Sequence, residues 1–295
     1  MKEYIIGIDG GGSKTDFLLT DKELNEVKRR FDSRSNPNDI GIENACKLIK
    51  KNALALCLDA GIDKSDVKAV FAGIAGASSS DFAERIGNAL KEAFPQAKAE
   101  ALHDGMNVLY GAFPDGDGVS VICGTGSSCF VKKGREIHRI GGYGAFDMCG
   151  NGYEIGRAAF AHALRTVDGR DEKTLLSEMM TEKAGGDLLK SLDKIVAMTK
   201  KELASCALIV FDAAEKGDKT AVSIIDMNMN YVAGLIKQAG TYFEGDYTVA
   251  LAGGVLSNGI ALKLLREKLS KRVTLVKSEN APSFGAAAYA RQLLT

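Results

Sequence analysis

The stretch Ile8–Asp21, which reads IDGGGSKTDFLLTD, decides how the rest of the chain is interpreted. Three consecutive glycines, a serine and a lysine stand between two apolar runs that predict β-strands. Glycine places few steric limits on the backbone, so N–H groups and hydroxyls in such a turn can point into one concavity that binds an anion. The stretch therefore predicts a strand, a phosphate-binding turn and a second strand.

Two common nucleotide-binding loops do not fit this stretch. A P-loop has the pattern GxxxxGK before Ser or Thr; Gly7 and Gly12 have the right separation, but Ser13 stands at the lysine position. The dinucleotide fingerprint GxGxxG opens a helix; Gly10 and Gly12 fit it, but Thr15 stands at the third glycine. The residues that follow predict a strand where both patterns require a helix. A phosphate-binding hairpin remains, with an ordinary tight turn as the alternative.

Asp9 and two later glycine turns favour the phosphate-binding interpretation. Asp9 ends the first predicted strand, and Mg²⁺ at phosphate sites takes few carboxylates and several waters. Asp9 is therefore the candidate metal ligand, directly or through water. The turn GTGS at Gly124–Ser127 repeats the first turn later in the chain, and Gly253–Gly254 supplies a third.

The composition limits the classes of partner. Lys+Arg and Asp+Glu both number 38 and no basic run occurs, so nucleic acid and anionic membranes are not expected partners. No apolar stretch approaches the ~20 residues that span a bilayer, and Asp9 interrupts the first apolar run before it could form a secretion signal. None of the six cysteines has CxxC spacing, which favours reduced thiols and a cytoplasmic protein.

The hydrophobic pattern predicts two matching halves of type βββαβα. The first half has predicted strands at Tyr4–Asp9, Asp16–Thr20, Val27–Phe31, Val67–Gly73 and Ala99–His103. The second half begins at Val119 and ends in a strand at Val273–Val276, and its clearest helix is Asp218–Gly240. We therefore expect a duplicated α/β fold with a cleft between two domains. The N-terminal domain is expected at residues 1–114 with a closing helix at 282–295, and the C-terminal domain at 115–281.

Five motifs occur in an order that resembles a known family: IGIDGGGSKTDFLL, HDGMNVLYGAF, VICGTGSSCF, RIGGYGAFDMCGNGYEIGRAAF and ALAGGVLSNG. With the closing APSFGAAAYA segment they make essentially the whole chain similar to the N-acetylglucosamine kinase and BadF/BadG/BcrA/BcrD ATPase family. That family belongs to the superfamily of sugar kinases, actin and heat-shock chaperones. The resemblance implies two ribonuclease H-like domains of the actin-like ATPase kind, with ATP and Mg²⁺ bound in the cleft.

For the nucleotide, the resemblance implies contacts from all three glycine turns. The first turn would meet the β- and γ-phosphates of ATP, the second would hold them from the other domain, and the third would let adenosine lie close to the backbone. The implied ATP-binding residues are Gly11, Gly12, Ser13, Lys14, Thr125, Gly126, Ser127, Gly253 and Gly254. The alternative for the second and third turns is a plain hairpin and a helix entry.

Asp104, in LHDG, is the residue to which the resemblance assigns catalysis. Phosphoryl transfer to an alcohol needs a base near the acceptor hydroxyl, and the dipole at the start of a helix keeps a carboxylate ionised. The alternative is a helix N-cap, a position that Asp favours anyway. The adjacent His103 is expected to have a structural role.

The resemblance also implies contacts to a sugar. Asn36 matches a position that hydrogen-bonds the sugar, although Asn-Pro is also an ordinary turn signal. Gly142 and Tyr143 match the family's GGWG element, where Tyr replaces a usual Trp and still offers an apolar ring face. Asp104 would orient the same sugar hydroxyl that it deprotonates.

One departure from the family pattern concerns the sugar. The family carries an Asp-Glu pair before GSGYWIG, but Met148 and Cys149 stand in its place, and the segment looks one residue shorter. A buried sugar hydroxyl without its partner loses much discrimination. Asp147 is the nearest carboxylate and is expected to take the sugar contact, with Glu154 as the alternative.

The leading hypothesis is an ATP-dependent kinase that phosphorylates a hydroxyl of an amino sugar, N-acetylglucosamine or a related sugar, and forms a homodimer. One alternative is a BadF-type ATPase that acts on a protein partner and holds an iron–sulfur cluster, for which Cys123, Cys129 and Cys149 are the candidates. Another is a sensor of sugar or nucleotide without turnover. The presence of Asp9 and Asp104 argues against the sensor, and the missing Asp-Glu pair argues for it.

Overall fold

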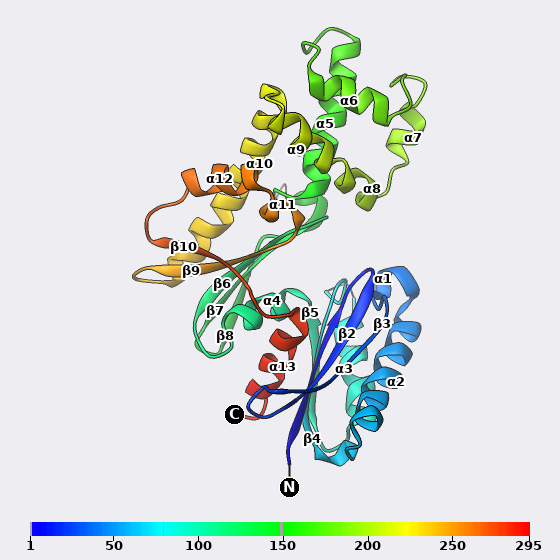
Figure 1. The fold of residues 1–295 in the computed structure, drawn as a ribbon, viewed down its shortest axis with the longest axis vertical. Coiled ribbons are helices and arrows are strands. Elements are labelled where there is room, and N and C mark those ends of the chain that lie inside the picture. Colours follow the sequence, from blue (N-terminus) through cyan, green and yellow to red (C-terminus); the bar gives the residue numbers. More distant parts are fainter. Residues whose placement is uncertain (1, 79, 148–149) are drawn as a thin grey trace. The chain divides into compact units, whose positions relative to one another are not determined.

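The structure is a computed structural model that describes residues 2–78, 80–147 and 150–295 (Figure 1). The chain divides into two compact units: Met1–Asp117 with Lys277–Thr295 form unit 1, and Gly118–Val276 form unit 2. Each unit contains one five-stranded sheet with helices packed on it. The predicted duplicated α/β architecture is confirmed.

The sheet of unit 1 has the strand order β3-β2-β1-β4-β5. Its strands are β1 (Tyr4–Gly10), β2 (Lys14–Asp21), β3 (Glu26–Ser33), β4 (Val67–Ile74) and β5 (Lys98–His103). The first three form an antiparallel meander, and β4 and β5 extend the sheet in parallel with β1. β1 is therefore central, and nearly all its side chains are buried.

Helices cover both faces of this sheet (Figure 1). On one face, α2 (Ile42–Ala60) contacts β2 and β3, and α3 (Phe82–Ala93) contacts β4 and β5; the short α1 (Pro37–Ile40) precedes α2. On the other, α4 (Gly105–Ala112) packs with α13 (Pro282–Gln292), which contacts β1. A Cβ at Gly7 of β1 would overlap the backbone nitrogen of Ala287, so glycine there allows α13 to lie directly on the sheet.

The sheet of unit 2 has the order β10-β9-β6-β7-β8, which is the same topology as in unit 1. Its strands are β6 (Gly118–Cys123), β7 (Ser127–Lys133), β8 (Glu136–Ile140), β9 (Tyr247–Ala252) and β10 (Val273–Lys277). β6 is antiparallel to β7 and parallel to β9, as β1 is to β2 and β4. The glycine turn between β6 and β7 therefore corresponds to the turn between β1 and β2.

Unit 2 carries a larger set of helices than unit 1. They are α5 (Gly152–Val167), α6 (Leu175–Lys183), α7 (Leu192–Val196), α8 (Lys200–Ser205), α9 (Ala207–Glu215), α10 (Lys219–Ala239), α11 (Gly254–Ser257) and α12 (Gly259–Glu267). α5, α9 and α10 pack on one another over a core that includes Ile155, Val210 and Met229. Within the described helices, none has the length and apolar character that crossing a membrane requires.

Candidate functional site

The first glycine turn joins β1 and β2 and is anchored at its base. The Gly11 N–H donates to the Lys14 carbonyl at 3.0 Å, and the Ala75 N–H donates to the Gly10 carbonyl at 2.7 Å. Residues 12–14 at the tip are exposed. The turn therefore has a fixed backbone and an open tip, as an anion-binding hairpin requires.

Asp9 lies at the end of β1 beside this turn. Asn107 Nδ2 donates to Asp9 Oδ1 at 2.6 Å and to the Gly73 carbonyl at 3.0 Å. The pKa of Asp9 is raised from 3.8 to about 6. Burial is the main cause, and the carboxylates of Asp104 and Asp16 add to it, whereas the Asn107 hydrogen bond and the charge of Lys14 lower the pKa. Asp9 thus lies in a concentration of negative charge that a cation would relieve.

The residues around Asp9 fit a magnesium ion. Asp9 is paired with Asp16 across the hairpin, so the two side chains share one face of the sheet. Asp16 Oδ2 accepts hydrogen bonds from Arg29 and Ser283, whereas Asp16 Oδ1 is buried and has no partner among the described residues. Carboxylate oxygens of this kind suit Mg²⁺, which completes its shell with water and phosphate. Asp16 was not among the predicted site residues, although its position opposite Asp9 in the hairpin was a usable signal.

Asp104 follows β5 and occupies the N-cap position of α4. Within the described structure its side chain makes no capping hydrogen bond. Asp104 Oδ1 lies 2.9 Å from His103 Nδ1, and the Gly105 N–H donates to the same nitrogen at 3.0 Å. One ring nitrogen cannot accept the Gly105 proton and donate to Asp104 at once, so these contacts exclude each other. Asp104 thus stands at the N-cap position that the alternative expected, but among the described contacts its side chain does not supply the capping hydrogen bond.

Asn36 is a turn residue in the structure. Asn36 Oδ1 accepts from the Asn38 N–H at 2.9 Å and caps α1, whose first residue is Pro37. The turn interpretation of Asn-Pro is therefore correct. A sugar contact would use the amide nitrogen of the same side chain and stays a prediction.

The second glycine turn joins β6 and β7 and lies against the start of α5. The Gly124 N–H donates to the Gly126 carbonyl at 2.8 Å, and the Gly152 N–H donates to the Gly124 carbonyl at 2.8 Å. Among the described atoms, none lies within 4 Å of a Cβ built at Gly126. Like the first turn, the second has a fixed base and an open tip.

A cavity of about 130 Å³ opens beside the second turn, with all its lining residues in unit 2. Six of them were singled out from the sequence: Thr125, Gly126, Ser127, Gly142, Asp147 and Glu154. The other lining residues, which were not among the predicted site residues, are Gly144, Asn151, Tyr153 and Lys200. Asn151 could have been found as the helix N-cap that it is, because its Oδ1 accepts from the Glu154 N–H at 3.0 Å.

The two candidate carboxylates for the sugar both line this cavity, and each has a hydrogen-bond partner. Asp147 Oδ2 accepts from the Gly142 N–H at 2.7 Å and thereby holds the GGYG segment. Glu154 Oε2 accepts from Arg157 Nε at 3.0 Å, and the Glu154 side chain is 12% exposed. Asp147 is therefore tied to the backbone of the predicted sugar-binding element, and Glu154 to a neighbouring cation.

The remaining residues of the predicted sugar element are only partly placed. Tyr143 is 65% exposed, and the Arg139 guanidinium lies 5.8 Å from the centre of its ring. Met148 and Cys149, which replace the family's Asp-Glu pair, lie outside the described residues. The ring contact of Tyr143 to a sugar stays a prediction.

The third glycine turn follows β9, and the structure gives Gly253 a different reason from the expected one. Gly253 has φ +94°, and a Cβ there would overlap the backbone of Cys123 in β6. The close packing of this turn against β6 is therefore enough to explain why a glycine stands at position 253, whether or not a ligand binds there. At Gly254, by contrast, none of the described atoms lies within 4 Å of an added Cβ, and the close approach of a nucleotide there stays a prediction.

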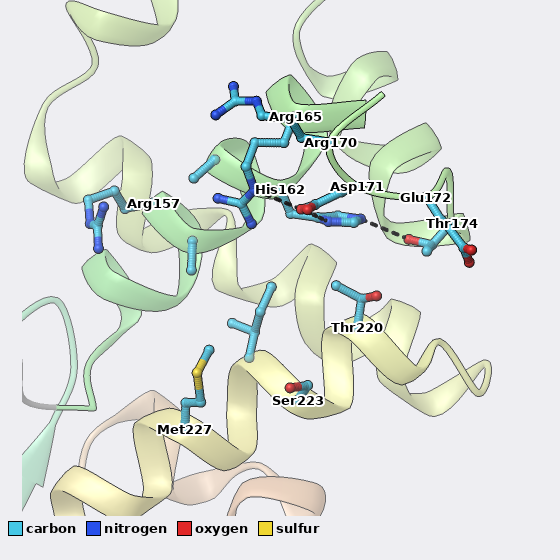
Figure 2. Close-up of a pocket in the computed structure, with 13 residues that line it drawn as sticks. Arg157, His162, Arg165, Arg170, Asp171, Glu172, Thr174, Thr220, Ser223 and Met227 are labelled. Atoms are coloured by element: carbon cyan, nitrogen blue, oxygen red, sulfur yellow. Dashed lines mark hydrogen bonds and ion pairs between the residues drawn. The ribbon is translucent and has the colours of Figure 1, made fainter. Parts of the chain in front are cut away.

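A larger hollow of about 600 Å³ lies elsewhere in unit 2, between α5, the segment after it and α10 (Figure 2). His162 is nearly buried there, with Nδ1 2.9 Å from Asp171 Oδ2 and Nε2 3.2 Å from Thr174 Oγ1. The hydrogen bond from His162 lowers the pKa of Asp171, as does Arg165. None of the predicted site residues is among those that line this hollow in the described structure.

The predicted residues fall into two groups. Unit 1 holds Asp9, Gly11, Gly12, Ser13, Lys14, Asn36 and Asp104, and unit 2 holds Thr125, Gly126, Ser127, Gly142, Tyr143, Asp147, Gly253 and Gly254. Within each unit the structure brings the glycine turn together with candidate acidic residues. The cleft that would join the two groups stays a prediction.

Two sheets of one topology, each with a glycine hairpin after its central strand, define a duplicated α/β fold. A model of the BadF/BadG/BcrA/BcrD ATPase family matches residues 6–290. The chain belongs to this family, and the actin-like fold class predicted from the sequence is confirmed.

Curated relatives and a solved structure resemble the chain over its whole length. An N-acetylmuramic acid/N-acetylglucosamine kinase from Clostridium acetobutylicum is 28% identical, covering 98% of each chain. An N-acetyl-D-glucosamine kinase from Dictyostelium discoideum is 26% identical, covering 97% of each. A proposed N-acetylglucosamine kinase from Chromobacterium violaceum has a TM-score of 0.74 at 21% identity, covering 98% of this chain and 99% of its own, which shows a shared fold.

Proposed function

We propose that this protein is an ATP-dependent kinase that transfers the γ-phosphoryl group to a hydroxyl of an amino sugar, N-acetylglucosamine or a related sugar. The observation that carries the proposal is the Asp104 carboxylate, which follows β5 in the unit with the first glycine hairpin and, within the described structure, makes no capping hydrogen bond although Asp104 is the N-cap residue of α4. Similarity to a sugar kinase over 98% of both chains supports the acceptor class.

Asp104 is the proposed base. The acceptor hydroxyl gives its proton to the Asp104 carboxylate while its oxygen bonds to the γ-phosphorus; the bond to the β–γ bridging oxygen breaks, and ADP leaves. General-base help of this kind contributes ~10²–10⁴-fold to the rate. Positioning of the two substrates and neutralisation of phosphate charge supply the rest.

The phosphates of ATP are assigned to the two hairpins. In unit 1, Gly11 belongs to the fixed base, and Gly12, Ser13 and Lys14 form the exposed tip. In unit 2, Thr125, Gly126 and Ser127 line a cavity. Gly254 is the proposed neighbour of adenosine, with Gly253 setting the turn. When bound, Mg²⁺ would neutralise phosphate charge; Asp9 and Asp16 are the residues that would hold it.

The acceptor contacts are assigned to Asn36 and Asp104 in unit 1 and to Gly142, Tyr143 and Asp147 in unit 2. Asp147 is preferred to Glu154 because it already holds Gly142, so one carboxylate would fix both the backbone and a sugar hydroxyl. We also propose a cytoplasmic homodimer, as is common for such kinases.

The iron–sulfur alternative is not favoured by the thiols. Cys123 and Cys129 are fully buried in β6 and β7, and Cys149 lies outside the described residues. In the part of the chain that the structure describes, no three His, Cys, Asp or Glu side chains are grouped as a metal site. A cluster shared between subunits needs cysteines at a surface, which these two strands do not offer.

A screen of sugars tests the proposed function. The purified protein is incubated with Mg²⁺-ATP and single sugars, ADP is measured, and the product is identified by mass. The proposal expects stoichiometric ADP and phosphosugar for an amino sugar. Sugar-independent ADP release, or none with any sugar, would contradict it.

A further inference from the structure

The second phosphate hairpin contains no cation of its own. The first hairpin carries Lys14, whereas the corresponding turn Gly124–Ser127 offers only backbone N–H groups and hydroxyls. The cavity beside it is also lined by the carboxylates of Asp147 and Glu154. A polyphosphate that entered this cavity would meet like charge, so a cation is needed for it to bind well.

Lys200 is the one lysine or arginine among the described residues that line this cavity. It is the first residue of α8, and its Nζ lies 6.0 Å from the centre of the Tyr153 ring, which also lines the cavity. Lys200 is exposed, so its ammonium group can turn toward a ligand without leaving a buried partner. The cation that the second hairpin lacks is thus supplied from another part of the chain.

The packing of α8 fixes where Lys200 can reach. Gly152 and Gly156 are one helical turn apart on α5, so they share one face. A Cβ at Gly156 would overlap the Leu203 carbonyl of α8, and one at Gly152 would lie 3.1 Å from the Ala204 carbonyl. The capping box of Thr199 and Glu202 closes the start of α8 beside Lys200. Two glycines of α5 therefore let α8 approach the second hairpin closely.

We propose that Lys200 binds the terminal phosphates of ATP at the second glycine hairpin, as a counterpart of Lys14 at the first. This inference rests on the proposed function, since it takes the hairpin to hold ATP. A hydrogen bond to a charged group is worth ~1.5–3 kcal/mol, so loss of the Lys200 ammonium should weaken ATP binding about 10- to 100-fold. The affinity for AMP, which lacks the β- and γ-phosphates, should change little when the Lys200 ammonium is removed.

Calorimetry on Lys200→Met and Lys201→Met tests the assignment, with a nonhydrolysable ATP analogue, ADP and AMP as probes. Lys201 is the matched control because it is the next residue of α8, is also exposed, and is not among the cavity's lining residues in the described structure. The expected result is a 10- to 100-fold weaker affinity of Lys200→Met for the ATP analogue, with AMP affinity and Lys201→Met nearly unchanged. Lys200→Arg should keep most of the affinity.

Three outcomes would overturn the inference. They are an unchanged affinity of Lys200→Met for the ATP analogue, an equal loss in Lys201→Met, and a Lys200→Met enzyme whose only change is a higher KM for the sugar. If the unsubstituted chain binds the ATP analogue and phosphorylates a sugar while Lys200→Met is normal, the inference fails and the proposed function stands. If the unsubstituted chain binds no nucleotide, both fail.

Discussion

Asn107 holds Asp9 in place: one amide nitrogen donates both to Asp9 Oδ1, at 2.6 Å, and to the Gly73 carbonyl of β4, at 3.0 Å. Asn107 is fully buried on α4, three residues after Asp104. A Cβ at Gly73 would overlap the Asn107 amide, so glycine at that position is needed for the contact. The helix that follows the proposed base thus also orients the proposed metal ligand.

The raised pKa of Asp9 makes a pH-dependent prediction. Between about pH 4 and pH 6 the folded chain keeps a proton on Asp9 that the unfolded chain has released, so this group's contribution to stability falls as pH rises through that window. Asp9→Asn removes the buried charge. We expect the variant to be more stable than the parent at pH 7.5, by roughly 1–3 kcal/mol, with the difference vanishing toward pH 4.

Urea unfolding in EDTA measures this difference, and Asp81→Asn at an exposed position is the control. Added Mg²⁺-ATP should stabilise the parent and not Asp9→Asn, because the ion needs the ionised carboxylate. If the Asp9→Asn protein is less stable than the parent at pH 7.5 in EDTA, the prediction is wrong. Other groups of the folded protein would then stabilise the ionised Asp9 carboxylate.

Valine at Gly12 or Gly126 should abolish nucleotide binding and leave the fold intact. In the described structure an added Cβ meets only Asp39 Oδ2, at 3.6 Å, at Gly12, and no atom within 4 Å at Gly126. The protein itself therefore accepts a side chain there, whereas bound phosphate would collide with it. Calorimetry with the nonhydrolysable ATP analogue measures the loss.

Gly245→Val is the matched control for Gly126→Val, because this glycine too has no described atom within 4 Å of an added Cβ and lies outside the three turns. It should bind nucleotide as the parent does. Normal affinity in folded Gly12→Val and Gly126→Val proteins would refute the assignment of phosphate to the hairpins.

Asp104→Asn should retain the fold and nearly all ATP affinity while turnover falls ~10²–10⁴-fold, the usual worth of a general base. Asn has the same shape and cannot take the proton. Asp81→Asn is again the control, since Asp81 precedes α3 in the same unit and, within the described contacts, also makes no capping hydrogen bond. Steady-state kinetics decides, and near-normal turnover in Asp104→Asn would rule out the proposed mechanism.

Asp147→Asn and Glu154→Gln separate the two candidates for the missing sugar carboxylate. If Asp147 contacts the sugar, its variant should raise the KM for the sugar far more than the KM for ATP and should change the preference among amino sugars. Glu154→Gln should then alter sugar kinetics much less. The reverse pattern would assign the contact to Glu154, and unchanged sugar kinetics in both would leave the acceptor to other residues.

The strands and the first two turns could be predicted because their signals are local. Alternating and continuous apolar runs fix the strands, and the glycines between them fix the hairpins. Asp104 could be located for the same reason, since it stands where a strand ends. The absence of a capping hydrogen bond from the Asp104 side chain, within the described contacts, could not be predicted. Asp is a favoured N-cap residue, and only the side-chain geometry shows that this one makes no such bond.

Two features could not be predicted because they depend on packing between distant segments. Lys200 reaches the second hairpin only because α8 lies on the glycine face of α5. Gly253 was predicted, but the sequence did not show that a side chain there would overlap the backbone of Cys123, 130 residues earlier in the chain. Contacts between distant segments leave no local sequence pattern. Neither the place of Lys200 nor the contact between Gly253 and Cys123 could therefore be derived from residue spacing.

The position of α13 sets the order in which the protein can be completed during synthesis. Ser283 Oγ donates to Asp16 Oδ2 at 2.8 Å, and the Ala287 backbone fills the space beside Gly7, so residues near the end of the chain close the first sheet. Domains made on a ribosome generally fold in the order in which they emerge. Here α4, on the same face, precedes unit 2, but β1 lacks the cover of α13 until residues 282–292 follow. Unit 1 therefore begins to form before unit 2 and is completed after it.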